Sequence, residues 1–182
     1  MRRENAQKMM RAYIVEAFIS LLKTRRFEEI TIAEIAARAG VHRSTCYRHF
    51  RGKEEMAVSF YAAVLAEGVE ALPAEEPPLP VYLARIFEAF FRRREAVLRL
   101  HESGLSHLLL AAMQDFFSVE ATSFSKALPL RHHMGGIWGD FLLWFDNGMQ
   151  PSPAAFARAT AKLCPPETRL LLLRNRRRAL PK

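Results

Sequence analysis

The side chains best suited to chemistry in this 182-residue sequence gather between Arg43 and Arg48. Two guanidinium groups and three hydroxyl groups occur within six residues, without a carboxylate among them; the hydroxyls belong to Ser44, Thr45 and Tyr47. Guanidinium groups bind guanine edges and phosphates, and hydroxyl groups bind bases or phosphates. On a helix, such a surface has the chemistry to enter the DNA major groove, where the first turn reaches base edges.

Two short helices joined by a tight turn are predicted to hold these side chains. Thr31 and Glu34 have the spacing of a capping box, so a helix is expected to begin at Thr31. Gly40 is expected to end it, because glycine readily takes a left-handed backbone, and the next helix is expected over about residues 43–49. An apolar seam is expected to fix the angle between the helices. Its members are Ile32, Ile35, Ala36, Val41, Cys46 and Phe50.

The rest of the sequence also shows helical periodicity, and strand alternation is absent, so the predicted fold is all-α. An N-terminal three-helix domain with a helix-turn-helix is expected in residues 1–55, linked through a helix over 53–71 to a helical domain in residues 56–182. Further helices are expected near 4–24, 81–92, 94–102, 106–126, 131–147, 153–163 and 167–179, with a loop at 72–80 and breaks at Gly104, Pro129, Pro151 and Pro153.

Charge is unevenly distributed along the chain, whose formal net charge is +8. Residues 1–55 carry 12 basic and 7 acidic residues, residues 56–168 carry 9 and 12, and residues 169–182 carry 6 and none. A basic N-terminal part indicates a polyanionic partner at that end. The basic tail at 174–182 is either a solvated helix end or a source of non-specific attraction to DNA.

Several classes of protein are not favoured by the sequence. No apolar run approaches the roughly 18 residues of a membrane span, and residues 1–5 do not begin a signal peptide. Two distant cysteines, Cys46 and Cys164, favour a cytoplasmic protein without disulfides. We find no phosphate-binding glycine loop, catalytic carboxylate pair, metal-ligand cluster or nucleophile elbow, so we expect no enzyme activity, no metal and no cofactor.

Residues 31–53, TIAEIAARAGVHRSTCYRHFRGK, resemble the DNA-binding domain of TetR-family bacterial regulators. The family pattern is a capped helix, an Ala-Gly-Val turn, Thr-x-Tyr-x-His-Phe and a lysine shortly after. Here these elements are residues 39–41, residues 45–50 and Lys53, preceded by a matching segment at residues 27–31. The resemblance covers about residues 8–65, and a later segment, Trp144 to Pro153, also resembles an element of some of these regulators.

The resemblance implies roles for individual side chains. Arg43 and Ser44 are expected to read bases, with Arg43 binding guanine O6 and N7 through two hydrogen bonds. Position 42 is His where the family often has a capping residue, so either the cap is weakened or His42 itself contacts DNA. Cys46 replaces a larger apolar residue and is either a small core residue or a redox switch. The expected DNA-binding residues are Thr31, His42, Arg43, Ser44, Thr45, Tyr47, Arg48, His49 and Lys53.

The resemblance also implies that residues 56–182 dimerise and bind a small molecule. Expected lining residues for an apolar or aromatic effector are Phe87, Phe91, Leu98, His101, Leu105, Met113 and Phe117, although such residues also form plain cores. Expected dimer-interface residues are Gly135, Gly136, Trp138, Gly139, Phe141, Leu142 and Phe156. The alternative is that these glycines relieve crowding within one subunit or open space for a ligand.

The function implied is that of a homodimeric repressor, which a small-molecule effector releases from palindromic double-stranded operator DNA. The alternative is a helical interaction or scaffolding protein whose helix-turn-helix has lost DNA binding. Salt-dependent affinity for duplex DNA separates the two hypotheses.

Overall fold

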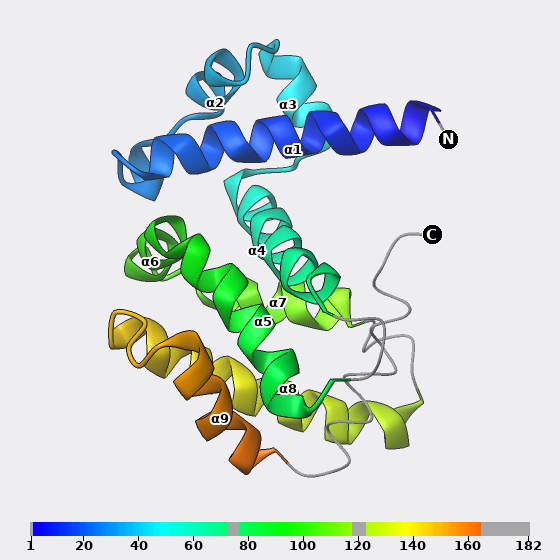
Figure 1. Ribbon diagram of the computed structural model, residues 1–182. Coiled ribbons are helices and arrows are strands. Elements are labelled where there is room, and N and C mark those ends of the chain that lie inside the picture. Colours follow the sequence, from blue (N-terminus) through cyan, green and yellow to red (C-terminus); the bar gives the residue numbers. More distant parts are fainter. Residues whose placement is uncertain (1, 73–76, 118–122, 165–182) are drawn as a thin grey trace. The chain divides into compact units, whose positions relative to one another are not determined.

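The computed structural model describes residues 2–72, 77–117 and 123–164, and all regular elements in these ranges are helices (Figure 1). The all-α prediction is therefore confirmed. None of the described helices has the length and hydropathy that crossing a membrane requires. The expected helix at 167–179 and the basic tail lie outside the described residues. The elements are α1 (Arg2–Leu22), the 3-10 turn η1 (Phe27–Glu29), α2 (Ile32–Arg38), α3 (Arg43–His49), α4 (Lys53–Glu70), α5 (Leu79–Arg92), α6 (Arg94–Glu102), α7 (His107–Phe116), α8 (Phe124–Asp146) and α9 (Pro153–Leu163).

The chain forms two compact units. The first contains Met1–Phe60 and Glu95–Leu108, which include α1, α2, α3, the first turns of α4, and most of α6. The second contains Tyr61–Arg94 and the described residues from Leu109 onward. Helix α6 follows α5 in the sequence but belongs to the same unit as the N-terminal helices. A single boundary in the sequence therefore cannot separate the two units.

The first unit is built on α1, with α2 and α3 both along one side of it (Figure 1). Ile14, Phe18 and Leu22 recur every four residues on α1 and are fully buried. The Phe18 ring meets the edge of Phe27 in η1 at a centroid separation of 6.1 Å. This apolar stripe confirms the predicted first helix and gives α2 and α3 a fixed base.

The second unit buries an aromatic cluster, and α5 packs against α9 within it. Phe87 lies 5.0 Å from Phe141 and 4.7 Å from Phe156 between ring centroids. The Trp144 indole Nε1 donates a hydrogen bond of 2.8 Å to the Pro151 carbonyl, which fixes the turn between α8 and α9. Phe141 and Phe156, which the sequence predicted at a dimer interface, are buried in the core of their own subunit.

Two expectations about the later helices are wrong. The pattern over 106–126 is not one helix, because α7 ends at Phe116 and α8 begins at Phe124. Pro129 lies inside α8 and does not end it. Proline there removes one backbone hydrogen bond, yet the 23-residue helix offsets this loss by burying one face along its length. That face consists of Leu130, Met134, Ile137, Phe141 and Trp144.

Candidate nucleic-acid interface

The start of α2 is fixed by the predicted capping box, which the structure confirms. The Thr31 backbone N–H donates to Glu34 Oε2 at 2.8 Å, and the Glu34 N–H donates to Thr31 Oγ1 at 3.3 Å. Arg25 also binds the Glu34 carboxylate. These contacts, led by the hydrogen bond from the Thr31 backbone, lower the pKa of Glu34 from 4.5 to about 2. The carboxylate is thus ionised at neutral pH and complements the positive end of α2.

The turn between α2 and α3 depends on Gly40, whose φ of +65° is the left-handed conformation predicted for it. Beyond the turn, the Val41 N–H donates to the Ala36 carbonyl at 3.0 Å. Cys46 is fully buried and Phe50 nearly so, which confirms the inward face of α3. Burial raises the pKa of the Cys46 thiol, so the group is protonated at neutral pH. A core role therefore fits Cys46 better than the redox alternative.

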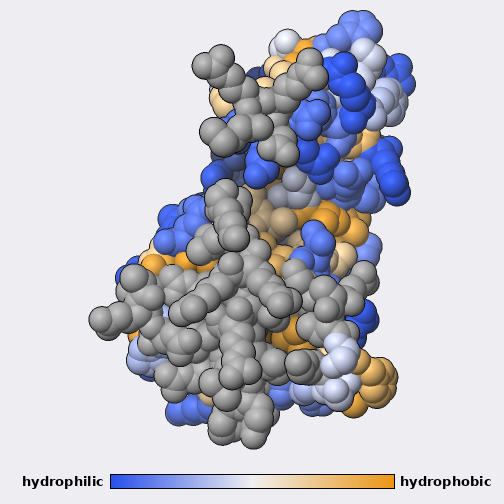
Figure 2. Space-filling view, turned by 90° about the vertical axis from the view of Figure 1, so that its right-hand side faces the viewer, coloured by the Kyte–Doolittle hydropathy of each residue, from blue (hydrophilic) through white to orange (hydrophobic). Residues whose placement is uncertain are grey.

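The outer face of α3 presents Arg43, Ser44, Tyr47 and Arg48 to solvent. Tyr47 leaves 51% of its surface exposed. Arg43 Nη2 donates to Tyr47 Oη at 3.0 Å, and the guanidinium lies 5.4 Å from the ring centroid. In the space-filling view, the upper part of the molecule, where α1 to α3 lie, is largely covered by hydrophilic residues (Figure 2). The exposed surface of α3 is thus basic and rich in hydroxyl groups. The contact between Arg43 and Tyr47 orders part of it before any partner binds.

His42 caps α3 with its imidazole ring. Its Nδ1 accepts from the Ser44 backbone N–H at 3.3 Å and lies 2.8 Å from Ser44 Oγ. This backbone hydrogen bond is as long as the one that Thr31 accepts at the start of α2, so His42 caps α3 no less closely than Thr31 caps α2. The contact also requires an unprotonated Nδ1, because a protonated nitrogen cannot accept.

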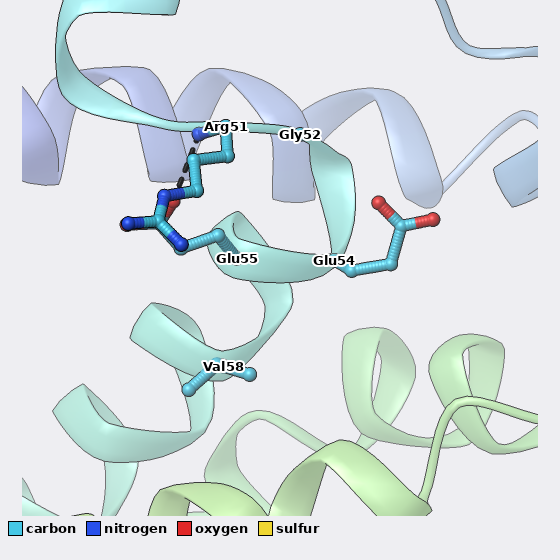
Figure 3. Close-up of a pocket in the computed structure, with 5 residues that line it drawn as sticks. All are labelled: Arg51, Gly52, Glu54, Glu55 and Val58. Atoms are coloured by element: carbon cyan, nitrogen blue, oxygen red, sulfur yellow. Dashed lines mark hydrogen bonds between the residues drawn. The ribbon is translucent and has the colours of Figure 1, made fainter.

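The far end of α3 is held by a cluster that the sequence did not suggest. The Arg11 guanidinium donates to the His49 carbonyl, lies 4.0 Å from the Phe50 ring centroid and binds Glu55 Oε1 at 3.3 Å. Glu55 also accepts from the Arg51 backbone N–H at 2.8 Å (Figure 3). That hydrogen bond, followed by the Arg11 contacts, lowers the pKa of Glu55.

A surface hollow of about 540 Å³ lies beside this cluster. Figure 3 shows the Arg51 side chain and the Glu55 carboxylate on one side of it and the Glu54 carboxylate on the other. Two carboxylates and one guanidinium make the hollow a poor site for a phosphate. The lining residues are Arg51, Gly52, Glu54, Glu55 and Val58.

Three of the expected DNA-binding residues differ in their surroundings. Thr31 is exposed at the start of α2, whereas Lys53 and His49 are half-buried. The Lys53 ammonium donates to the Phe27 carbonyl at 2.5 Å and lies 4.3 Å from the Phe27 ring centroid. The pKa of His49 is lowered, mainly by burial and then by the Arg48 and Arg11 charges. His49 is therefore neutral at neutral pH, and Lys53 already stabilises the unit before any phosphate arrives.

The expected effector pocket is only partly assembled. A cavity of about 20 Å³, enough for about one water molecule, lies in the second unit between α4, α5, α7 and α8. Phe87, Met113 and Phe117 line it, but Leu98, His101 and Leu105 belong to the first unit and Phe91 stacks against Trp144. Three of the seven expected lining residues therefore line this cavity, and an effector site formed by all seven stays a prediction. The complete lining is Leu65, Leu83, Ile86, Phe87, Met113, Phe117, Ile137 and Phe141.

The outer face of α8 carries the glycines expected at a dimer interface. Gly136 and Gly139 are exposed, Gly135 is half-buried, and a Cβ added at any of them would meet no described atom within 4 Å. Leu143 continues this face and is 68% exposed, although it is not among the interface residues predicted from the sequence. The spacing 136, 139, 143 is a helical signal that could have identified it. The expected residues Trp138 and Leu142 are half-buried.

Residues 14–59 match the family model described as bacterial regulatory proteins, tetR family. No curated protein matches the chain in sequence. A crystal structure of a tetR-family transcriptional regulator from Streptomyces coelicolor aligns with a TM-score of 0.46 and 17% identity, over 92% of this chain and 88% of the other. A putative transcriptional regulator from Pseudomonas aeruginosa PAO1 aligns with a TM-score of 0.40 and 20% identity, over 92% of each chain.

Among the described residues, no three His, Cys, Asp or Glu side chains group as metal ligands.

Proposed function

Because residues 14–59 match the family model of the tetR bacterial regulatory proteins, we propose that this chain binds operator DNA by inserting α3 into the major groove. The observation that carries the proposal is the outer face of α3. Four polar side chains without a carboxylate project from it, while Cys46 and Phe50 anchor its inner face. A short helix with polar residues outside and apolar residues inside is stabilised by the unit on which it packs. Its first turn is then available to contact base edges.

Arg43 is the proposed base-reading residue. It stands in the first turn of α3, and a guanidinium can donate two hydrogen bonds to guanine O6 and N7. The contact with Tyr47 restricts Arg43 before DNA arrives, which reduces the side-chain entropy lost on binding. Ser44 and Arg48 share the exposed face and are proposed to contact the neighbouring bases or phosphates.

The proposed phosphate contacts surround α3. Thr31 carries a hydroxyl and Lys53 an ammonium at the starts of α2 and α4, at the positive ends of the two helix dipoles. The Lys53 ammonium uses one donor on Phe27 and has two left for a phosphate. Tyr47 and neutral His49 would add uncharged donors. Such contacts position the protein, whereas Arg43 would select the sequence.

A homodimer is proposed to present two copies of α3. The exposed face of α8 at Gly136, Gly139 and Leu143 allows close approach of a second copy related by a two-fold axis. Two α3 helices about 34–36 Å apart would then enter successive major grooves, which requires a palindromic operator.

We further propose an apolar or aromatic effector for the cavity in the second unit, because all eight lining residues are apolar. The cavity is far smaller than the roughly 300 Å³ of typical ligand sites, so binding would have to separate the lining helices. A coupling free energy of about 1–3 kcal/mol between effector binding and operator binding would lower operator affinity about 5–150-fold. The protein would then be a repressor that its ligand releases from DNA.

The experiment is selection of duplexes from a random pool with the full chain, followed by fluorescence anisotropy on a selected duplex and on a scrambled one. We expect the logarithm of the binding constant to fall linearly with the logarithm of salt concentration. Arg43→Ala should weaken binding to the selected duplex by about 1–3 kcal/mol and relax selectivity at one base pair.

Arg158→Ala is the matched control, because Arg158 is an exposed arginine on α9, which belongs to the second unit. It should leave selectivity unchanged. If the parent chain enriches no sequence and binds duplexes without salt dependence, the proposal fails and the scaffolding alternative gains support.

A further inference from the structure

Arg11 lies on α1, outside the helix-turn-helix, yet all three of its partners belong to the end of α3 and the start of α4. It donates to the carbonyl of His49, the last residue of α3, and lies over the ring of Phe50, the residue that caps it. Its third partner, Glu55, is in the first turn of α4. One side chain therefore ties α1, α3 and α4 together at a single point.

The orientation of α3 depends on such anchors because the helix has only seven residues. At 1.5 Å per residue, Arg43 lies about 9 Å along the axis from His49. A tilt of about 5° about the His49 end would then move the start of α3 by about 0.8 Å. That displacement exceeds the roughly 0.5 Å within which a recognition group has to be held.

The surroundings of Arg11 argue against a direct role in binding phosphate. Its side chain is only 35% exposed, and the Glu55 carboxylate lies 3.3 Å from its guanidinium. Glu55 is itself held by the Arg51 backbone N–H and is ionised at neutral pH. A phosphate approaching Arg11 would therefore meet a fixed negative charge.

We propose that Arg11 is a positioning residue, which sets the tilt of α3 through His49, Phe50 and Glu55 and thereby determines sequence selectivity without touching DNA. The inference rests on the proposed function. It predicts that loss of the contact lowers affinity for the selected duplex while leaving the non-specific, charge-driven affinity in place.

The test uses the full chain as Arg11→Met, which keeps an unbranched apolar side chain over Phe50, and as Glu55→Gln, which removes only the charge at the other end of the ion pair. Anisotropy on the selected and scrambled duplexes gives the ratio of affinities and the salt dependence, and urea unfolding confirms that the chains are folded. Arg158→Met is the matched control, because it removes an exposed arginine from α9.

We expect Arg11→Met to lower the affinity ratio by about 5-fold to 150-fold, the range of one lost base contact, with little change in the salt slope. Glu55→Gln should lower the ratio in the same direction. The inference is overturned if Arg11→Met weakens both duplexes equally and reduces the salt slope by about 0.9, the signature of a lost phosphate contact. It is also overturned if Glu55→Gln tightens binding to both duplexes.

If Arg11→Met does not fold, Glu55→Gln alone tests the inference. A positioning role for Arg11 predicts a lower affinity ratio, whereas a direct phosphate contact predicts tighter binding to both duplexes. A parent chain that selects no sequence would refute the proposed function itself. A parent that selects a sequence, with variants that keep its affinity ratio, would refute only the role of Arg11.

Discussion

The double substitution of Gly136 and Gly139 to alanine separates the stability of a subunit from the stability of the proposed dimer. Both glycines are exposed in the interior of α8, and an added Cβ would meet no described atom within 4 Å. Alanine in a helix interior is more stable than glycine by about 0.5–1 kcal/mol per site. Within a single subunit, the two changes should therefore stabilise by about 1–2 kcal/mol.

In the proposed dimer the same methyl groups would have the opposite effect. A two-fold axis brings each substitution into the interface twice, and overpacking costs about 1–3 kcal/mol per site where the neighbours cannot move. The dimer constant should then weaken at least about tenfold, which corresponds to about 1.4 kcal/mol.

Sedimentation equilibrium measures the dimer constant, and urea unfolding at several protein concentrations extrapolates to the stability of the separated subunit. Ala63→Gly calibrates the helix-propensity contribution, because Ala63 is exposed on α4. A dimer constant that is unchanged or tighter in the double variant would show that this face of α8 does not meet a second copy.

Three further measurements test the packing and the electrostatics. Gly68→Ala should lower the free energy of unfolding by about 1–3 kcal/mol, because its Cβ would lie 2.8 Å from the Ile86 Cα; equal or greater stability would mean that α4 and α5 separate freely. Glu34 should stabilise the fold fully above its ordinary pKa of 4.5 and lose this contribution as the pH falls towards its folded pKa of about 2. In urea unfolding across that range, Glu34→Gln should show a smaller loss of stability than the parent. Burial raises the pKa of Asp140, to which Thr160 is hydrogen-bonded, so stability should fall as the pH rises through that pKa. Asp140→Asn should therefore stabilise the chain at neutral pH and gain little in acid, whereas a loss at neutral pH would contradict the effect of burial.

Local signals in the sequence predicted the DNA-binding part of the structure. The capping and turn contacts of Thr31, Glu34 and Gly40 involve residues only a few positions away in the sequence. Their geometry therefore follows from short-range chemistry. The inward positions of Cys46 and Phe50 likewise follow from the helical period.

Features that depend on distant parts of the chain were not predicted. Arg11 meets Glu55 across 44 positions, and no periodicity in the sequence links them. Pro129 was expected to end a helix, but the buried face of α8 offsets the lost hydrogen bond. Phe91 does not line the cavity although it lies on α5 with Phe87, because its ring stacks on Trp144, and residue types alone do not specify this packing.

The burial of Cys46 provides a built-in reporter of how often the first unit opens. A thiol reagent can reach this sulfur only when α3 leaves the unit, because the side chain has no exposed surface. Replacing Cys164 with serine would leave a single thiol, and its labelling rate would then give the free energy of local opening. Slower labelling in the presence of a bound duplex would measure, without any attached dye, how strongly that partner holds the helix in place.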